Sequence, residues 1–421
     1  MRRTSRDIRT ANRYRVLRHI VARSPVSRRE LAAATELSPA TVANLVGQLL
    51  DLGMLVEVGY EDSDGGRPRG LLAVNSSGGA LIGVDVAETY VHVELFDLAL
   101  TVLARADEEL RPGENDPAEV VAHIAAAVSS VVERADVAAD RVLGVGVSMP
   151  GQVDREGGVS VFAANWDWHD VPLLRLLADH LPYPLHLDNP LRACTVAEQW
   201  FGAARGRNDA VVVNLGTGVG AGLALGGALH RGVSNSAGEW GHTTLILDGR
   251  QCHCGNQGCV ETYVGAPGIM RNLHELSPDS PLLHPEDQTA TIEAIGRGLA
   301  DGDPVAEKVV RATARYLGAA LADLINLLNP EVIVLSSWVA AALGEPLLAE
   351  VREAVAVRAL RRPLANTEIV LCPIPSNPVS LGAATFALEG SLASVGLRTG
   401  PRTGPKSRRT STPRKATEES R

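Results

Sequence analysis

The sequence lacks any hydrophobic run of the length needed to cross a lipid bilayer, which is about 18 apolar residues. Its start, Met1-Arg2-Arg3-Thr4, is basic but is not followed by the apolar segment of a secretory signal. Cysteine is also scarce: the chain has five, and three of them lie between Cys252 and Cys259. This arrangement does not resemble a disulfide framework. We therefore expect a cytoplasmic protein with a metal site and no membrane association.

An overall excess of basic charge is missing as well, because 40 Lys and Arg face 49 Asp and Glu, a net charge of −9. Residues 1–70 nevertheless carry a net +4 and residues 391–421 a net +6, which leaves −19 for the middle of the chain. The acidic middle argues against a general phosphate-binding surface, whereas the N-terminal segment can still carry one. The composition excludes a wholly disordered or fibrous chain, and 421 residues predict about two or three domains.

Residues 8–74 begin with two predicted helices. The first carries apolar residues at helical spacing and ends at Ser24-Pro25, because the residue before a proline avoids the helical conformation. Ser27 is followed three residues later by Glu30, a capping-box pattern that opens a second helix running to about Thr35.

A third helix and two strands complete this unit. Ser38 is the predicted N-cap, Pro39 occupies the first turn, and the apolar stripe that follows ends at Gly53. Strands at 54–58 and 71–74 are joined by a glycine-rich basic segment. This order of elements predicts a winged helix-turn-helix domain over residues 1–76.

The third helix of this unit has a polar face opposite its apolar stripe. In a winged helix-turn-helix such a face meets base edges, the helix N-terminus meets a phosphate, and arginines of the wing enter the minor groove. The alternative is a helical protein-interaction module with a solvated face. The predicted DNA contacts are Arg28, Arg29, Ser38, Thr41, Asn44, Gln48, Arg67 and Arg69.

Residues 80–390 alternate apolar strand patterns with helical ones, which predicts an α/β fold in two lobes. Strand patterns at 80–86 and 211–215 each precede a second strand pattern, and this weak repeat suggests duplicated lobes. Residues 391–421 are rich in Ser, Thr, Pro, Gly and basic residues, so we expect a disordered basic tail.

A metal site is indicated by the pattern Cys-x-Cys-x4-Cys. Cys252, Cys254 and Cys259, with His242 ten residues upstream, offer three thiolates and one imidazole, as in a closed structural zinc site. His253 is the alternative fourth ligand, although its position between two ligating cysteines strains that geometry. The other alternative is a loop of reduced cysteines without metal.

These residues resemble a known family signature. The run Gly238-Glu239-Trp240-Gly241-His242, followed by the cysteine run that ends at Glu261, is similar to that of the ROK family of repressors, open reading frames and kinases. The resemblance covers residues 80–390 and implies an actin-like ATPase fold. The preceding winged helix matches the repressor branch, which includes xylose and N-acetylglucosamine regulators.

The resemblance also implies a sugar-binding cleft. Its expected sugar ligands are Asn165, Asn189, Glu239, His242 and Glu261, with Gly151 in the matching loop. Two alternatives concern local structure, since Asn189 could cap the following helix and Trp166 and Trp168 could simply pack.

The kinase motifs of the family are damaged in three places. The first phosphate loop has Ala87 and Glu88 where the family has two glycines, Pro190 replaces the catalytic Asp, and Ser336-Ser337 replaces a glycine pair. Only the glycine run 216–222 is intact. We therefore expect no enzyme activity.

The resemblance thus implies a sugar-responsive repressor of carbohydrate genes, a homodimer or homotetramer that binds operator DNA and holds structural Zn²⁺. The alternatives are an active sugar kinase with an added DNA-binding domain and a zinc-stabilised DNA-binding scaffold without ligand.

Overall fold

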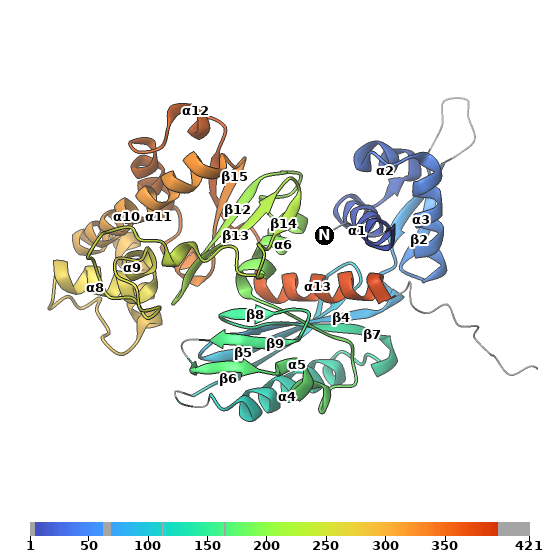
Figure 1. Cartoon of the computed structure of the whole chain (residues 1–421), viewed down its shortest axis with the longest axis horizontal. Helices are drawn as coiled ribbons and strands as arrows, with labels where there is room; N and C mark the ends of the chain where they lie inside the picture. Colours follow the sequence, from blue (N-terminus) through green and yellow to red (C-terminus); the bar gives the residue numbers. More distant parts are fainter. Residues whose placement is uncertain (1–4, 62–68, 112, 114, 164–165, 395–421) are drawn as a thin grey trace, which may run out of the picture.

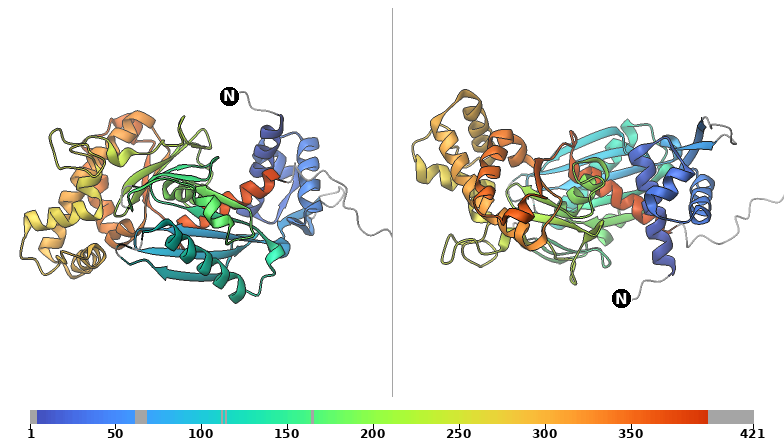
Figure 2. Two further views of the ribbon diagram at one scale, coloured as in Figure 1. Left: turned by 60° about the horizontal axis from the view of Figure 1, so that its bottom comes forward. Right: turned by 90° about the horizontal axis from the view of Figure 1, so that it is seen from above.

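The computed structural model describes residues 5–61, 69–111, 113, 115–163 and 166–394. They form a small N-terminal domain and two larger lobes, with helices α6 (Pro190–Phe201) and α13 (Pro378–Ser394) between the lobes (Figure 1). The N-terminal domain lies at one end of α13 in all views (Figures 1 and 2). Among the helices described, none is long and apolar enough to span a membrane.

The N-terminal domain has the element order expected of a winged helix-turn-helix. It contains α1 (Ser5–Arg23), β1 (Val26–Ser27), α2 (Arg28–Thr35), α3 (Pro39–Asp51), β2 (Leu55–Glu61) and β3 (Arg69–Val74), with an antiparallel sheet in the order β1-β3-β2. The predicted capping box is present, because Ser27 Oγ accepts from Glu30 N–H and the Glu30 carboxylate accepts from Ser27 N–H. Apolar residues of all three helices are fully buried between them, including Leu17, Leu31 and Leu49.

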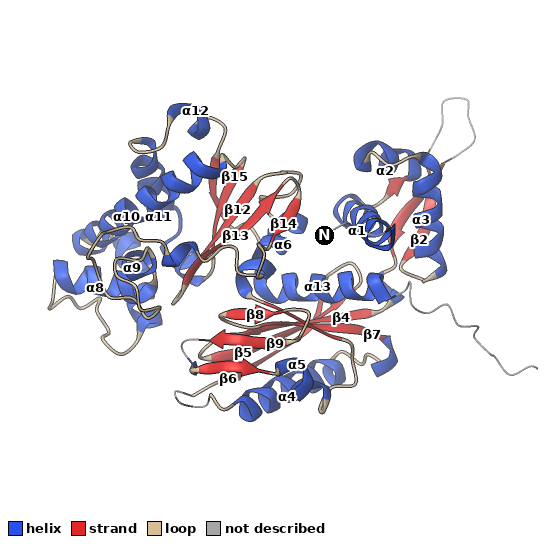
Figure 3. Ribbon diagram, viewed as in Figure 1, coloured by secondary structure: helices blue, strands red, loops and turns tan. Residues whose placement is uncertain are grey.

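Lobe I (residues 80–188) is built on a five-stranded sheet in the order β11-β7-β4-β5-β6. Figure 3 shows the strands of this lobe lying beneath α13. Helix α4 (Pro117–Arg134) buries its apolar stripe in the lobe I core. The strands of this sheet are β4 (Ala80–Val86), β5 (Tyr90–Asp97), β6 (Val102–Glu109), β7 (Val142–Ser148) and β11 (Leu185–Asp188). The lobe also holds a smaller sheet and one short helix, namely β8 (Gln152–Asp154), β9 (Val159–Ala163), β10 (Trp168–Val171) and α5 (Leu173–Ala178).

Lobe II (residues 210–371) has a five-stranded sheet in the order β14-β13-β12-β15-β16. Its strands are β12 (Ala210–Leu215), β13 (Val219–Leu225), β14 (Ala228–His230), β15 (Val332–Ser336) and β16 (Glu368–Leu371). Its helices are α7 (Glu261–Val264), α8 (Ala266–Leu276), α9 (Gln288–Asp301), α10 (Pro304–Leu328), α11 (Trp338–Ala356) and α12 (Arg361–Leu364).

The two sheets repeat one topology, as the weak sequence repeat suggested. In each, the first strand pairs antiparallel with the second and parallel with the fourth, and the fourth pairs parallel with the fifth. The helix after the last strand of each lobe packs on the sheet of the other lobe. Thus α6 follows β11 and packs on β12 and β13, whereas α13 follows β16 and packs on β4 and β7. The lobes have therefore exchanged their last helices.

Helix α13 extends past residue 390, where the sequence suggested that the tail begins. The polar composition of 391–421 concealed Leu392, whose side chain is fully buried. The folded part of the chain thus reaches Ser394, and residues 395–421 lie outside the described residues.

Candidate functional site

One imidazole and three thiols cluster in the loop between β14 and α7. The ligand atoms of His242, Cys252, Cys254 and Cys259 all lie within 4.8 Å of one another. Cys254 Sγ is 3.7 Å from Cys259 Sγ, and Cys252 Sγ is 3.6 Å from His242 Nδ1. Tetrahedral ligands about 2.3 Å from one zinc ion lie about 3.8 Å apart, so this donor set fits structural zinc. The predicted four residues form one cluster, and His253 is outside it.

A tight turn holds the last thiol of this cluster in place. Gly258, next to Cys259, has φ +76, and a Cβ there would lie 1.6 Å from the carbonyl oxygen of Ile246. Only glycine allows this approach, and it buries Cys259 completely.

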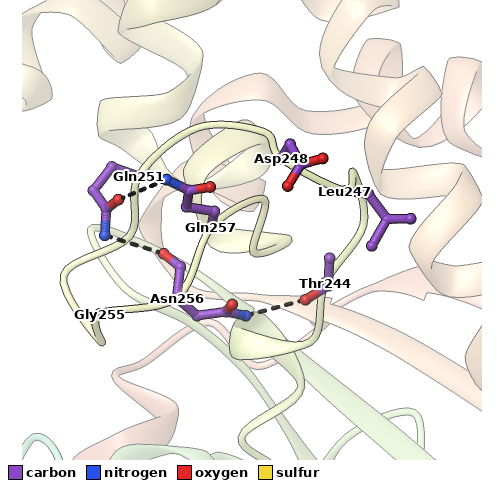
Figure 4. A pocket seen from close by; sticks show the side chains of 7 residues that line it. All are labelled: Thr244, Leu247, Asp248, Gln251, Gly255, Asn256 and Gln257. Atoms are coloured by element: carbon purple, nitrogen blue, oxygen red, sulfur yellow. Dashed lines mark hydrogen bonds between the residues drawn. The ribbon is translucent and has the colours of Figure 1, made fainter.

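A shallow polar pocket lies beside the same loop (Figure 4). Within it Asn256 Nδ2 donates to Thr244 Oγ1 at 3.0 Å and Gln257 Nε2 donates to Gln251 Oε1 at 3.3 Å. These amide groups bond to the loop itself, and none of the expected sugar ligands lines the pocket. Its lining residues are Thr244, Leu247, Asp248, Gln251, Gly255, Asn256 and Gln257.

Three of the expected sugar ligands are half-buried at the zinc cluster: His242 belongs to it, and Glu239 and Glu261 lie beside it. Glu261 Oε2 accepts from the backbone N–H of Val219 at 2.9 Å, and its Oε1 lies 4.0 Å from His242 Nδ1. Burial raises the pKa of Glu239, while His242 and Arg192 oppose that shift. Two carboxylates and an imidazole therefore converge where the family resemblance places a sugar.

Asn189 is buried at the start of α6 and has two partners. Its Oδ1 accepts from Arg192 N–H at 3.2 Å, and its Nδ2 donates to the Gly151 carbonyl at 3.4 Å. The capping role that we considered as an alternative is thus present, and the same side chain contacts the Gly151 loop. Asn165 lies outside the described residues. Trp166 and Trp168 are buried and pack against each other with ring centroids 4.8 Å apart and ring planes inclined at 57°, as the packing alternative holds.

Sequence reasoning missed a buried ion cluster beside Asn189. Asp188, 1% exposed, lies 3.2 Å from Arg192 and 2.5 Å from Arg231. Arg192, 2% exposed, also donates to the backbone carbonyl of Asn235. The only local signal was the spacing of Asp188 and Arg192, four residues apart. Arg231 comes from the other lobe, so this cluster ties the two lobes together.

The damaged phosphate loop of lobe I is closed by side chains. Asp85, at the end of β4 and 4% exposed, accepts from Tyr90 Oη at 3.1 Å and from Asn377 Nδ2 at 2.8 Å. Burial raises the pKa of Asp85, and the two donors oppose that shift. Its oxygen Oδ2 is thus engaged within the protein by Tyr90 and by the residue that precedes α13.

The glycine run of lobe II has a packing role. A Cβ at Gly220 would lie 2.5 Å from Leu191 Cδ1, and one at Gly222 would lie 1.7 Å from Thr195 Oγ1, both on α6. At Gly216 a Cβ would meet the Trp338 indole at 3.2 Å. The close approach of α6 to β13 therefore requires glycine at 222, where a Cβ would also lie 2.4 Å from the Leu191 carbonyl oxygen, whereas at 220 the flexible Leu191 side chain can move aside.

The predicted DNA-reading face is partly exposed and partly engaged. Arg29, Ser38 and Asn44 are exposed, whereas Thr41 is half-buried. Ser38 caps α3, because its Oγ accepts from Thr41 N–H at 3.1 Å. The exposed Ser38 and Asn44 thus lie on or beside the first turns of α3, where such a domain meets DNA, whereas Arg29 is on α2.

The other predicted DNA contacts differ in their surroundings. Arg28 forms an ion pair with Glu57 of the wing at 2.8 Å. Gln48 Oε1 accepts from Arg13 of α1, and its Nε2 donates to Asn44 Oδ1 at 2.5 Å. Arg67 lies outside the described residues, and Arg69 is the first residue of β3.

A winged-helix domain followed by two lobes of one sheet topology, with a zinc cluster in the second, defines a regulator built on a sugar-kinase-like, actin-like fold. The chain belongs to the ROK family, whose profile matches residues 81–389.

The similarity to known repressors extends over nearly the whole chain. The chain is 28% identical to the xylose repressor of Caldicellulosiruptor bescii, over 91% of this chain and 96% of the relative. It is 26% identical to the DNA-binding transcriptional repressor Mlc of Escherichia coli, over 93% of each. A crystal structure of a ROK family transcriptional regulator that is a homologue of Mlc matches 93% of this chain with a TM-score of 0.77 and 26% identity, and 98% of that chain is covered. A ROK family glucokinase from Streptomyces griseus, with glucose and AMPPNP, matches 74% of this chain and 100% of its own at a TM-score of 0.63 and 29% identity.

Proposed function

We propose that this chain is a sugar-responsive transcriptional repressor of genes for carbohydrate uptake or catabolism. The observation that carries the proposal is a winged helix-turn-helix joined to a kinase-like cleft in which Pro190 stands at the position of the catalytic base. Proline has no side-chain group that can accept a proton, so the cleft can bind a sugar without phosphorylating it. The full-length similarity to the xylose repressor and to Mlc supports the same function.

In this proposal residues 1–76 read DNA, and the chain from residue 80 to the end of α13 senses sugar. Asn189, Glu239, His242 and Glu261 bind the sugar hydroxyls, together with Asn165. His242 also joins Cys252, Cys254 and Cys259 in holding structural zinc, which fixes the loop that carries the sugar ligands. The DNA contacts are Arg28, Arg29, Ser38, Thr41, Asn44, Gln48, Arg67 and Arg69.

Two or four copies of the chain bind one operator in the cytoplasm. Symmetric oligomers of winged-helix proteins meet half-sites about one helical turn of DNA apart, so we expect a pseudo-palindromic operator. Sugar binding releases the DNA, which requires different sugar affinities in the free and DNA-bound states.

Two measurements test the proposal. Purified full-length protein is used to select duplexes from a random DNA pool, and the recovered sequence should contain two related half-sites. The same protein is melted with D-xylose, D-glucose or N-acetyl-D-glucosamine at high concentration, and at least one should raise its melting temperature. No stabilisation by any of the three would favour a scaffold without ligand.

An assay for ATP turnover with the same sugars separates the repressor from a kinase. We expect no turnover. Sugar-dependent turnover that Gly218→Ala abolishes would overturn the repressor proposal, because a Cβ at Gly218 meets nothing closer than Glu261 Oε2 at 3.5 Å and so leaves the fold intact.

A further inference from the structure

Helix α6 runs from the candidate sugar cleft to the N-terminal domain. Its N-cap is Asn189, an expected sugar ligand, and its last turn carries Gln199 and Trp200. Twelve residues span about 18 Å at 1.5 Å per residue. One helix therefore reaches from the proposed effector site to α1 of the DNA-reading domain.

The contact between α6 and α1 is specific and buried. Trp200, 1% exposed, donates from Nε1 to Tyr14 Oη at 2.9 Å, and the two rings meet edge to face with centroids 5.1 Å apart. Arg18 Nη2 donates to the Gln199 carbonyl at 2.6 Å. Just beyond the helix, Arg205 donates to the Ala22 carbonyl near the end of α1. Two hydrogen bonds and one aromatic pair thus hold α1 on α6, and a third hydrogen bond holds it on the turn that follows α6.

Helix α6 is packed too tightly to deform locally along its length. Every residue from Arg192 to Trp200 is buried. On one side the backbone of β13 approaches it at Gly222, and on the other a Cβ at Gly382 of α13 would lie 1.9 Å from the Ala193 carbonyl oxygen. A helix packed this closely moves as a rigid body, because interiors at such density transmit displacement rather than absorb it.

Helix α1 carries the contact on to the reading helix. Arg13, next to Tyr14 and 7% exposed, donates from Nε and Nη2 to Gln48 Oε1 at 3.0 and 2.6 Å. Gln48 in turn donates to Asn44 on the exposed face of α3. Arg13 Nη1 also donates to the Leu392 carbonyl of α13 at 3.3 Å. Helix α1 is therefore seated across both exchanged helices and positions two predicted base-reading side chains.

We propose that α6 transmits sugar binding to DNA reading through its contact with Tyr14 and Arg18 of α1, and that Arg13 passes the resulting shift to Gln48 and Asn44. This inference rests on the proposed function. A sugar that binds Asn189 shifts the first turn of α6 relative to α13, and the rigid helix carries the same shift to Trp200. Since α1 is bonded to α6 by Arg18 and to α13 by Arg13, relative movement of the two helices changes how α3 is held.

The test measures the coupling ratio in the full-length protein. This ratio is the dissociation constant for the selected duplex in saturating sugar divided by that without sugar. The probe sugar is the one of the three named above that stabilises the wild type. Arg18→Met removes the bond to Gln199, and Tyr14→Phe removes only the hydroxyl bonded to Trp200. Arg352→Met is the matched control, because Arg352 makes the same kind of bond to the Ile369 carbonyl at 2.7 Å, far from α1.

We expect Arg18→Met to reduce the coupling ratio by about threefold or more, and Tyr14→Phe to reduce it less. Sugar affinity, measured by calorimetry, should stay within about twofold of the wild type, since the cleft is unchanged. Amide exchange of α1 should respond to sugar in the wild type and in Arg352→Met but not in Arg18→Met.

The outcomes separate the inference from the function on which it rests. A responsive wild type with unchanged ratios in both α1 variants overturns the inference and leaves the repressor in place. An equal loss in Arg352→Met also overturns it, because the effect would then be one of general stability. A wild-type ratio of one overturns the proposed function and this inference together.

Discussion

The two lobes share one sheet topology but differ in the turn that joins their first two strands. In lobe I the turn after β4 contains Ala87 and Glu88, and the Asp85 carboxylate is held by Tyr90 and Asn377. In lobe II the turn after β12 keeps its glycines, and a zinc cluster and three of the five candidate sugar ligands follow β14. The same framework thus encloses an internally bonded carboxylate in lobe I and carries the zinc cluster in lobe II.

The two exchanged helices share two features, an Asn-Pro start and a close contact with a glycine of the sheet. Each begins with Asn-Pro, at Asn189-Pro190 in α6 and Asn377-Pro378 in α13, and each asparagine caps its helix. Each helix also meets a glycine of the sheet it covers, Gly222 in lobe II and Gly83 in lobe I. Glycines persist where a helix backbone lies against the sheet, whereas the lobe I glycines that would serve only a phosphate are gone.

Loss of the zinc cluster should have the largest effect on stability. It should unfold part of lobe II before lobe I, so that the two lobes no longer unfold together. Cys259→Ser should lose the metal and more than about 3 kcal/mol of stability, because metal binding and loop folding are one process. Metal content and thermal melting check this. The control is Cys372→Ser, a thiol outside the cluster. A variant that still holds one zinc per chain would show that the ligand set is different.

Replacing either of the two sheet glycines that lie under the exchanged helices should destabilise the protein by a similar amount. Gly222→Ala places a Cβ 2.4 Å from the Leu191 carbonyl oxygen, and Gly83→Ala places one 1.8 Å from that of Ser380. Each should cost about 3 kcal/mol, since neither helix backbone can withdraw.

Urea unfolding of both variants measures this cost, with Gly218→Ala as the control, whose Cβ has room. If Gly218→Ala destabilises the protein as much as Gly222→Ala, the glycine run is not retained for packing.

Alkaline pH should weaken lobe I in particular. Burial alone would lower the pKa of His92, but the carboxylates of Glu94 and Asp107 outweigh it and raise the pKa to about 9 from 6.5. The protonated imidazole is then the form that stabilises the fold. This contribution is complete below pH 6.5 and is lost as pH rises through 9.

We expect the loss to be about 1–2 kcal/mol, because Asp107 is largely exposed and its attraction is screened. Hydrogen exchange of β5 and β6 at about pH 6 and about pH 10 measures it. His92→Gln should remove the difference, and a variant with the wild-type pH dependence would exclude His92 as its source.

The smallest effect should be a gain of stability from a glycine at Ser337, in the Ser336-Ser337 pair that stands where the family has two glycines. Ser337 has φ +78 and ψ 174, a conformation that side chains other than hydrogen adopt only with strain. Ser337→Gly should therefore stabilise the protein by about 1 kcal/mol in urea unfolding. Ser129→Gly, within α4, is the control and should destabilise it by a similar amount. A loss of stability in Ser337→Gly would show that the serine hydroxyl outweighs the strain.

The sequence predicted the features that depend on neighbouring residues. The capping box at Ser27 and Glu30, the cap at Ser38 and the cysteine spacing are all local patterns, and each is found. The duplicated sheet was also detectable, because buried strands leave continuous apolar runs.

Contacts between distant residues were not predictable in the same way. Asp188 and Arg231 are far apart in sequence, as are Asp85 and Asn377, and nothing at either position indicates its partner. Gln48 was identified as a base reader from its helix face alone, whereas its bond to Arg13 depends on how α1 packs. Side chains that join separate elements acquire their partners only from the tertiary fold.

The position of α13 has a consequence for how the protein is made. The ribosome releases the N-terminal domain first, whereas the Leu392 carbonyl that receives Arg13 belongs to the last turns of the last helix. Until those turns emerge, β4 and β7 lack the helix that covers them, and α1 lacks one of its two supports. During synthesis the DNA-reading domain is therefore complete before α6 and α13 are available to hold α1. Each new chain passes through an interval in which its DNA-reading domain is folded but not yet packed against the sugar-sensing lobes.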